Sequence, residues 1–224
     1  MGFEFLNVKM FLLRKEIPLH LCSMKKWLIL LVLFQIQMAQ AQNFTGELVL
    51  GLAGTQVSGD QLQGFNKGGL IAGGGVRLHF NKLSSLGFRI QYFQKGSRKA
   101  SDIENGDPTL YLMRLNYMEV PVFYRYNYKK FFLEAGPSMG VLVGNSEEDQ
   151  DGEMPLRKEF NRIDISGSFG LGYILSKKWN FAFNYYQSLL PVRSHSGDAV
   201  YRLNRGQYNS AITFNLIYNL TAGE

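Results

Sequence analysis

Residues 207–220 read Gln-Tyr-Asn-Ser-Ala-Ile-Thr-Phe-Asn-Leu-Ile-Tyr-Asn-Leu, and this stretch decides the fold class. Its even-numbered positions are mostly aromatic or aliphatic, whereas its odd-numbered positions are mostly amide, hydroxyl or small residues. Successive side chains of a β-strand point to opposite faces, so a strand here has one apolar and one polar face. We therefore expect a strand with Phe214 and Leu216 on one face and Asn215 on the other.

The same alternation recurs upstream, in runs rich in Tyr, Phe, Val and Leu that end at turn-forming residues. Such runs are typical of β-strands. They predict eight strands, at residues 47–56, 69–80, 85–96, 112–126, 131–144, 161–175, 179–190 and 207–220. No stretch after Met38 has the roughly 18 apolar residues of a membrane helix. The sequence therefore predicts an all-β chain.

The connections between these strands alternate in length. Three short ones, at 81–84, 127–130 and 176–178, separate four long ones, at 57–68, 97–111, 145–160 and 191–206. Outer-membrane barrels have an even number of antiparallel strands with short periplasmic turns and long extracellular loops. We therefore expect an eight-stranded antiparallel up-and-down transmembrane β-barrel. Because an open edge in hydrocarbon leaves backbone groups unsatisfied, the first and last strands should pair near Leu48 and Leu216.

The N-terminal residues have the order of an export signal. Met24-Lys25-Lys26 is basic, residues 27–38 are mostly apolar, and Ala39-Gln40-Ala41 matches a cleavage site. We expect residues 24–41 to be a signal peptide and residues 42–224 to be the barrel domain. Residues 1–23 have no role in such a signal, and we interpret them as an upstream extension from a start codon assigned too early.

Charge and cysteine content exclude two classes of protein. Without residues 1–41 the chain holds 19 Lys and Arg against 16 Asp and Glu, a dispersed net charge of +3. Nucleic-acid binding requires positive charge clustered on one surface, so no nucleic-acid partner is expected. The one cysteine, Cys22, precedes the expected cleavage site, so disulfides would not hold the exported domain together.

The polar strand faces predict a charged interior. By alternation the lumen should receive a charge network of Arg77, Arg89, Glu119, Arg125, Glu134, Arg162 and Asp164, with polar groups from His79, Gln91, Asn184 and Asn215. An eight-stranded barrel is just wide enough to be filled by side chains, and buried charges need partners. We expect a salt-bridged plug in which Glu119 or Glu134 pairs with an interior arginine. A narrow water or ion path is the alternative.

One expected strand departs from the alternation. Within residues 112–126, Leu115 and Tyr117 occupy positions that should face the polar lumen. Pro121 and Pro137 lie inside expected strands, where proline removes a donor from the strand ladder. Either the strands bulge at these prolines or the alternation slips by one residue.

No catalytic, cofactor or metal site is expected. Ser194, His195 and Asp198 are the residue types of a nucleophilic triad, but a triad is defined by geometry, and a Ser/Gly/Asp-rich loop contains such residues by composition. The acidic residues within 147–151 lack the spacing of a Ca²⁺-binding loop. The sequence therefore favours a protein that is not an enzyme.

Four motifs together resemble those of a known family. They are Gly51-Leu-Ala-Gly54-Thr-Gln56-Val-Ser-Gly59-Asp60, Gly64-Phe65-Asn66-Lys67-Gly68-Gly69-Leu70, Tyr117-Met118-Glu119-Val120-Pro121-Val122 and Gly136-Pro137-Ser138-Met139-Gly140. Over nearly all of residues 43–220 the chain resembles the small outer-membrane β-barrel proteins of Gram-negative bacteria termed porin family or PorT-like. The resemblance implies contact with outer-membrane lipid and lipopolysaccharide, and insertion by the outer-membrane assembly machinery. One branch supports protein secretion, which would add a secretion-system or surface protein partner.

Three functional classes remain open at this point. The leading one is a non-catalytic outer-membrane protein with a structural or interaction role, whose outer loops make the contacts. The second is an accessory barrel of protein secretion. The third is a soluble ligand-binding barrel of lipocalin type, which would have an apolar interior and a polar exterior.

Overall fold

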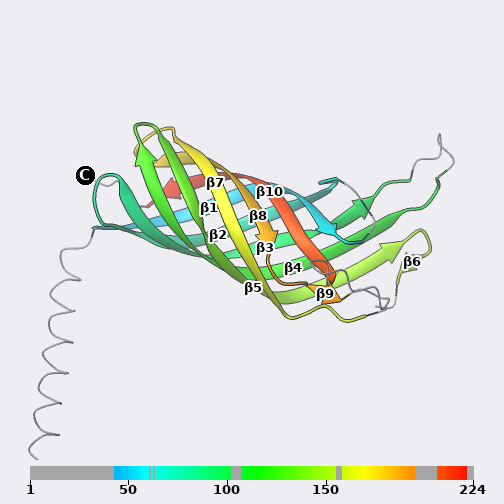
Figure 1. Cartoon of the computed structure of the whole chain (residues 1–224). Coiled ribbons are helices and arrows are strands. Elements are labelled where there is room, and N and C mark those ends of the chain that lie inside the picture. The colour runs from blue at the N-terminus through cyan, green and yellow to red at the C-terminus, as the bar shows by residue number, and fades with distance from the viewer. Residues whose placement is uncertain are drawn as a thin grey trace, which may run out of the picture. The chain divides into compact units, whose positions relative to one another are not determined.

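The computed structural model describes residues 43–220, apart from residues 61, 63, 102–106, 155–157 and 195–205. Eight long strands form a ring in chain order (Figure 1): β1 (Asn43–Ser58), β2 (Lys67–His79), β3 (Ser84–Lys99), β4 (Tyr111–Tyr128), β5 (Phe131–Asp149), β7 (Ile163–Ile174), β8 (Trp179–Ser188) and β10 (Gly206–Asn219). Two short strands, β6 (Gly152–Glu153) and β9 (Arg193–Ser194), pair with β5 and β10 respectively.

The ring closes where the sequence predicts. β1 pairs antiparallel with β10, so that Leu48 lies opposite Tyr218 and Leu50 opposite Leu216. Each of the other neighbouring pairs of long strands is also antiparallel. The prediction of an all-β, eight-stranded up-and-down barrel is therefore confirmed.

The short and long connections lie at opposite ends of the barrel. The three short turns, at 80–83, 129–130 and 175–178, and the first residues of β1 define what we call the turn end. The β4–β5 turn needs only two residues, because Lys129 adopts a φ of 56° in the left-handed region. The opposite end carries the long connections, and we call it the loop end. β4 and β5 have 18 and 19 residues, more than the roughly 9 to 11 that cross a bilayer.

The outer face of the ring is apolar and the inner face is largely polar. Exposed aliphatic and aromatic side chains occur on all eight long strands, with Leu50 and Leu52 each 64% exposed. Buried charged and amide side chains alternate with them along the same strands. A lipocalin-type barrel has the reverse polarity, so these faces are incompatible with the soluble ligand-binding class considered above. Among the described residues, no helix is long and apolar enough to cross a membrane.

Strand β4 has an irregular register with β5, but at a position other than the prolines. Leu115 and Tyr117 do face inward, fully buried in an apolar cluster near the loop end. Pro121 and Pro137 keep the register of their strands, and burial keeps alternating along β4, so neither the expected bulge at the prolines nor the expected slip of the alternation occurs. The pairing of β4 with β5 instead shifts between Asn116 and Tyr117.

Candidate functional site: the charged barrel interior

Five charged side chains near the turn end form one ion-pair network, which we call the turn-side network: Glu47, Arg77, Arg89, Arg125 and Glu134. Arg89 joins the two acids, since its Nε donates to Glu47 Oε1 at 2.5 Å and its Nη2 donates to Glu134 Oε1 at 3.1 Å. Arg125 donates to the same Glu134 oxygen, with Nε at 2.6 Å. Arg77 Nη2 lies 3.9 Å from Glu47 Oε2. None of the five side chains reaches solvent appreciably.

Aromatic rings support two of these guanidinium groups. The Cζ atom of Arg89 lies 4.0 Å from the ring centroid of Phe123, and that of Arg125 lies 4.0 Å from the ring centroid of Phe132. A cation over an aromatic face is attracted to it, and the attraction is stronger away from water. The rings therefore stabilise charges that the carboxylates alone would leave partly uncompensated.

Inward-facing glycines make room for these rings. A Cβ atom on Gly87 would lie 2.1 Å from Cζ of Phe123, and one on Gly172 would lie 1.9 Å from Cζ of Phe132. Each glycine lies opposite its phenylalanine on the neighbouring strand. These two rings thus lie across positions that have no side chain.

A second network, nearer the loop end, centres on one lysine, and we call it the loop-side network. Lys95 Nζ lies 2.5 Å from Glu119 Oε1 and 3.0 Å from Asp164 Oδ2. Asp164 also accepts hydrogen bonds from Ser188 Oγ at 2.7 Å and from Asn209 Nδ2 at 2.9 Å. One base and two acids give this network a net charge of −1, whereas the three bases and two acids of the turn-side network give +1. Together the two networks are neutral.

Apolar side chains fill space beside both networks. One buried cluster consists of Val49, Ala53, Ile71, Phe93, Phe132, Ala182, Tyr186, Ala211 and Ile217. Within it, the Phe93 and Tyr186 rings meet edge to face at a centroid distance of 5.3 Å. The Lys95 ammonium lies 4.9 Å from the centroid of the Phe93 ring. The loop-side network and this cluster are therefore in direct contact.

The loop end of the interior is covered by an apolar cluster and one further ion pair. The cluster consists of Val57, Met113, Leu115, Tyr117 and Phe160. Arg193 of β9 lies over the Phe160 ring at 4.2 Å, and its Nη2 lies 2.7 Å from Glu147 Oε1. Tyr111 donates a hydrogen bond to the same oxygen at 2.8 Å. The segments next to β7 and β8 thus pack onto the interior at this end.

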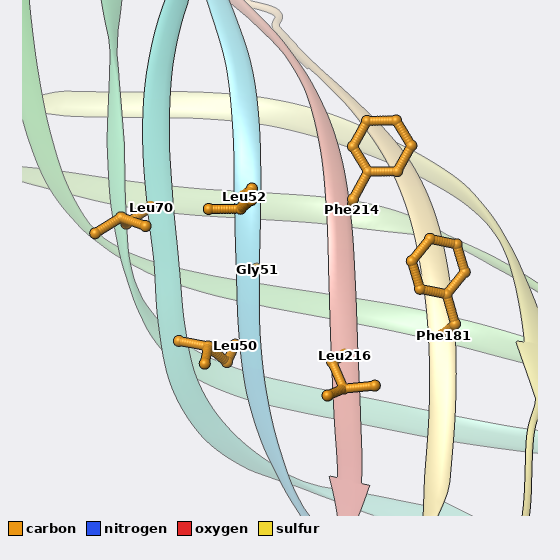
Figure 2. Close-up of a pocket in the computed structure, with 7 residues that line it drawn as sticks. All are labelled: Leu50, Gly51, Leu52, Leu70, Phe181, Phe214 and Leu216. Atoms are coloured by element: carbon orange, nitrogen blue, oxygen red, sulfur yellow. The ribbon is translucent and has the colours of Figure 1, made fainter.

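A hollow of about 300 Å³ lies on the outer surface of the barrel and not in the lumen. Figure 2 shows its lining residues, which come from β1, β2, β8 and β10 and are Leu50, Gly51, Leu52, Leu70, Phe181, Phe214 and Leu216. The hollow crosses the β1–β10 seam and is lined almost wholly by apolar groups. Such a surface suits lipid chains better than a polar solute.

The family of the chain follows from a comparison of its sequence. Residues 37–193 match the family described as outer membrane protein beta-barrel domain. The chain belongs to this family. It is an outer-membrane β-barrel protein, and its apolar exterior and closed ring suit a bilayer. The finer resemblance to the PorT-like branch stays a prediction.

Solved structures that are similar to this chain are distant in sequence. Neisserial surface protein A is 10% identical, with a TM-score of 0.50 over 80% of this chain and 99% of its own. The attachment invasion locus protein Ail of Yersinia pestis is 12% identical, with a TM-score of 0.47 over 79% of this chain and 98% of its own. CarO of Acinetobacter baumannii is 10% identical, with a TM-score of 0.44 over 78% of this chain and 96% of its own. Comparison with curated proteins finds no match.

The structure places six of the seven residues of the expected charge network inside the barrel: Arg77, Arg89, Glu119, Arg125, Glu134 and Asp164. Glu134 contacts two arginines, whereas Glu119 contacts Lys95. Arg162 is exposed, so its assignment to the lumen was wrong. Because β7 begins at Ile163, Arg162 precedes the strand, and alternation no longer determines where its side chain points.

Sequence reasoning missed two central members of the networks. Glu47 has the inward parity of β1, since Leu48 and Leu50 point outward. Lys95 has the same parity as Arg89 on β3. Carrying the alternation to the ends of both strands would have found them. Gln91, Asn184 and Asn215 are buried as expected, and His79 is half-buried.

The residue types of a nucleophilic triad or a metal site that the sequence singled out are only partly described by the structure. Ser194 is exposed in β9, while His195 and Asp198 lie outside the described residues. Across the described ranges, no three His, Cys, Asp or Glu side chains are grouped to hold a metal ion. Glu147 and Glu148 of the acidic run pair with Arg193 and Arg114 respectively.

Proposed function

We propose that this outer-membrane barrel is a non-catalytic protein with a structural or interaction role, whose lumen is closed by its own side chains. Its long loops would then make its functional contacts, because connecting segments on a rigid scaffold commonly carry binding residues. We also expect contact with outer-membrane lipid and lipopolysaccharide, and insertion by the outer-membrane assembly machinery.

The observation that carries the proposal is the pairing of the buried acids with bases, although the buried Lys67 donates to the Gly68 carbonyl and lies in no ion pair among the described residues. Each buried acid among the described residues lies in an ion pair with a base: Glu47, Glu119, Glu134, Glu147 and Asp164. A pathway for ions of one sign needs charges that are free to attract them. The two networks instead have opposite net charges that cancel. Together with the apolar clusters, this favours a closed lumen over a porin.

Conductance across a planar lipid bilayer tests the closed lumen. The folded wild-type chain should give no steady conductance, because paired charges and packed rings occupy the path. Glu134→Ala should leak, because it leaves Arg89 and Arg125 facing each other without their shared carboxylate. Glu119→Ala should also leak, because it removes one of the two carboxylates that pair with Lys95. Removing one partner of a buried pair costs about 3–5 kcal/mol, so each variant must first be shown to fold.

Two controls make the outcome decisive. Glu153→Ala removes an exposed carboxylate from β6 and should leave the barrel silent. Glu134→Gln keeps the volume of the side chain, and its folded state is checked by heat-dependent migration on gels. A large, steady wild-type conductance would overturn the closed lumen and make the protein a porin. Silence in both folded alanine variants would show that the ion pairs are not what closes it.

A further inference from the structure

Exposed lysines cap every short turn of the barrel. The β2–β3 turn carries Lys82, the β4–β5 turn carries Lys129 and Lys130, and the β7–β8 turn carries Lys177 and Lys178. We call these five the turn lysines. All five side chains are exposed. They come from three turns far apart in the sequence, which the closed ring brings to one end of the molecule (Figure 1).

Acidic side chains that reach solvent are confined to the opposite end in the described part of the chain. They are Asp60, Asp107, Glu148, Asp149, Asp151, Glu153 and Glu159. The described acids nearest the turn end are Glu47 and Glu134, which are buried and already paired inside the barrel. Within the part of the chain that the structure describes, the exposed charge at the turn end is therefore of one sign, whereas the loop end carries both signs.

The turn lysines continue directly from the apolar exterior. Lys129 follows Tyr128, Lys130 precedes Phe131, and Lys178 precedes Trp179. These three aromatic side chains are between 42% and 60% exposed. Lys129 Nζ lies 5.4 Å from the Tyr128 ring centroid. Outer-membrane barrels have girdles of aromatic side chains at the two membrane–water interfaces. The lysines thus lie at the level of the lipid headgroups.

We propose that the turn lysines bind the phosphate groups of anionic phospholipids in the leaflet that the short turns face. Lysine ammonium groups on flexible stems reach a headgroup phosphate while the stems lie along apolar surface. Several basic groups at a membrane surface enrich anionic lipids next to them, and salt weakens the attraction. The continuity of the lysines with the aromatic residues favours a lipid over a soluble acidic protein. The inference needs only the membrane placement of the barrel, so its failure would leave the closed lumen untouched.

Trp179 is a built-in reporter at this end. The chain has two tryptophans, and Trp27→Phe in the full chain leaves Trp179 alone. The barrel is folded into vesicles of phosphatidylcholine and phosphatidylglycerol of one fixed composition. Brominated chains, which quench tryptophan fluorescence, are placed either on the phosphatidylglycerol or on an equal amount of phosphatidylcholine. Because only the labelled headgroup differs, the ratio of the two quenching values measures enrichment of the anionic lipid beside Trp179.

Quenching by labelled phosphatidylglycerol should exceed that by labelled phosphatidylcholine by about twofold or more, and high salt should reduce the ratio toward one. A variant with Gln at 82, 130, 177 and 178 and Asn at 129 should lose the enrichment. Asn is chosen at 129 because it tolerates the positive φ found there. Neutralising Arg98, Lys99 and Arg114 at the loop end is the matched control and should keep the ratio.

Equal quenching by the two labelled lipids in the wild-type chain would overturn the proposal, and would point to an acidic soluble partner for the turn lysines. Enrichment that persists in the folded five-residue variant would also overturn it, because the preference would then arise elsewhere. Inorganic phosphate should weaken the enrichment no more than chloride does at equal ionic strength. A specific loss with phosphate would assign the lysines to the free ion instead of the lipid.

Discussion

At the scale of single residues, large interior side chains lie across glycines of the neighbouring strand. Phe132 lies across Gly172, and Arg125 stacks on the same ring while it bonds Glu134. The asparagine side chain of Asn184 lies across Gly170 in the same way. The position of the Arg125 guanidinium therefore depends on Gly172, because this glycine leaves room for the ring on which Arg125 stacks.

Gly172→Ala tests this dependence. The added methyl group would collide with the Phe132 ring, which must move and take the Arg125 stacking with it. Overpacking of this kind costs about 1–3 kcal/mol, and we expect the free energy of unfolding in vesicles to fall by that amount. Urea unfolding followed by Trp179 fluorescence measures it.

Gly68→Ala is the matched control on β2. A Cβ at Gly68 meets no heavy atom within 4 Å, so the substitution should change stability by no more than about 0.5 kcal/mol in the unfavourable direction. A loss at Gly68 as large as that at Gly172 would show that glycine is needed for backbone reasons and not for packing of the ring.

At the scale of the strands, the barrel depends on the seam between β1 and β10. Their pairing runs from Glu47 opposite Asn219 to Ser58 opposite Tyr208. The family match ends at residue 193, before β10 begins, so the strand that closes the ring lies outside the matched range. The register of this seam therefore needs its own test.

A disulfide across the seam reports that register. Leu50 and Leu216 are opposite each other and both point outward. Directly opposed residues of antiparallel strands have Cα atoms about 4.5–5.5 Å apart, within the range of a disulfide. In a Cys22→Ser background, Leu50→Cys with Leu216→Cys should therefore crosslink on oxidation. Mass mapping of the peptides identifies the bond.

The mismatched pair of Leu50→Cys with Ile212→Cys is the control. Ile212 lies opposite Gly54 and four residues along β10 from Leu216. At about 3.3 Å per residue, it is displaced roughly 13 Å along the strand from the position opposite Leu50. No disulfide should form there. Equal crosslinking of both pairs would mean that the seam slides between registers.

At the scale of the whole molecule, polarity is sorted twice. Apolar groups face outward and charges face inward, while the turn lysines and the exposed acids lie at opposite ends of the described barrel. The first sorting suits a bilayer around the ring, and the second gives the barrel a direction across that bilayer. Both sortings have a role only if the chain is exported to the outer membrane.

We expect the exported chain to begin at Gln42. Lys25 and Lys26, the apolar run and the Ala39-Gln40-Ala41 site predict cleavage after Ala41. N-terminal sequencing of the protein recovered from outer membranes measures this directly. A cytoplasmic product that still carries residues 27–41 would contradict it.

The sequence alone determined the architecture of this protein. Alternation with a period of two is a local property, so Arg89, Arg125 and Glu134 could be assigned to the inner face from their neighbours in the chain. Loop lengths then indicated the order and direction of the strands. The same logic was sufficient for Glu47 and Lys95, had it been extended to the ends of their strands.

Only the tertiary structure decided which charges meet. Alternation tells which face a side chain is on, but the register between strands and the closure of the ring decide its depth and its partners. Lys95 pairs with Asp164, which is 69 residues away in the sequence. Glu119 also pairs with Lys95 and not with an arginine. Leu115 and Tyr117 face inward without loss because Phe160, from a long connection, packs against them in an apolar cluster. These pairings join residues that no local pattern connects, so they exist only once the barrel has closed.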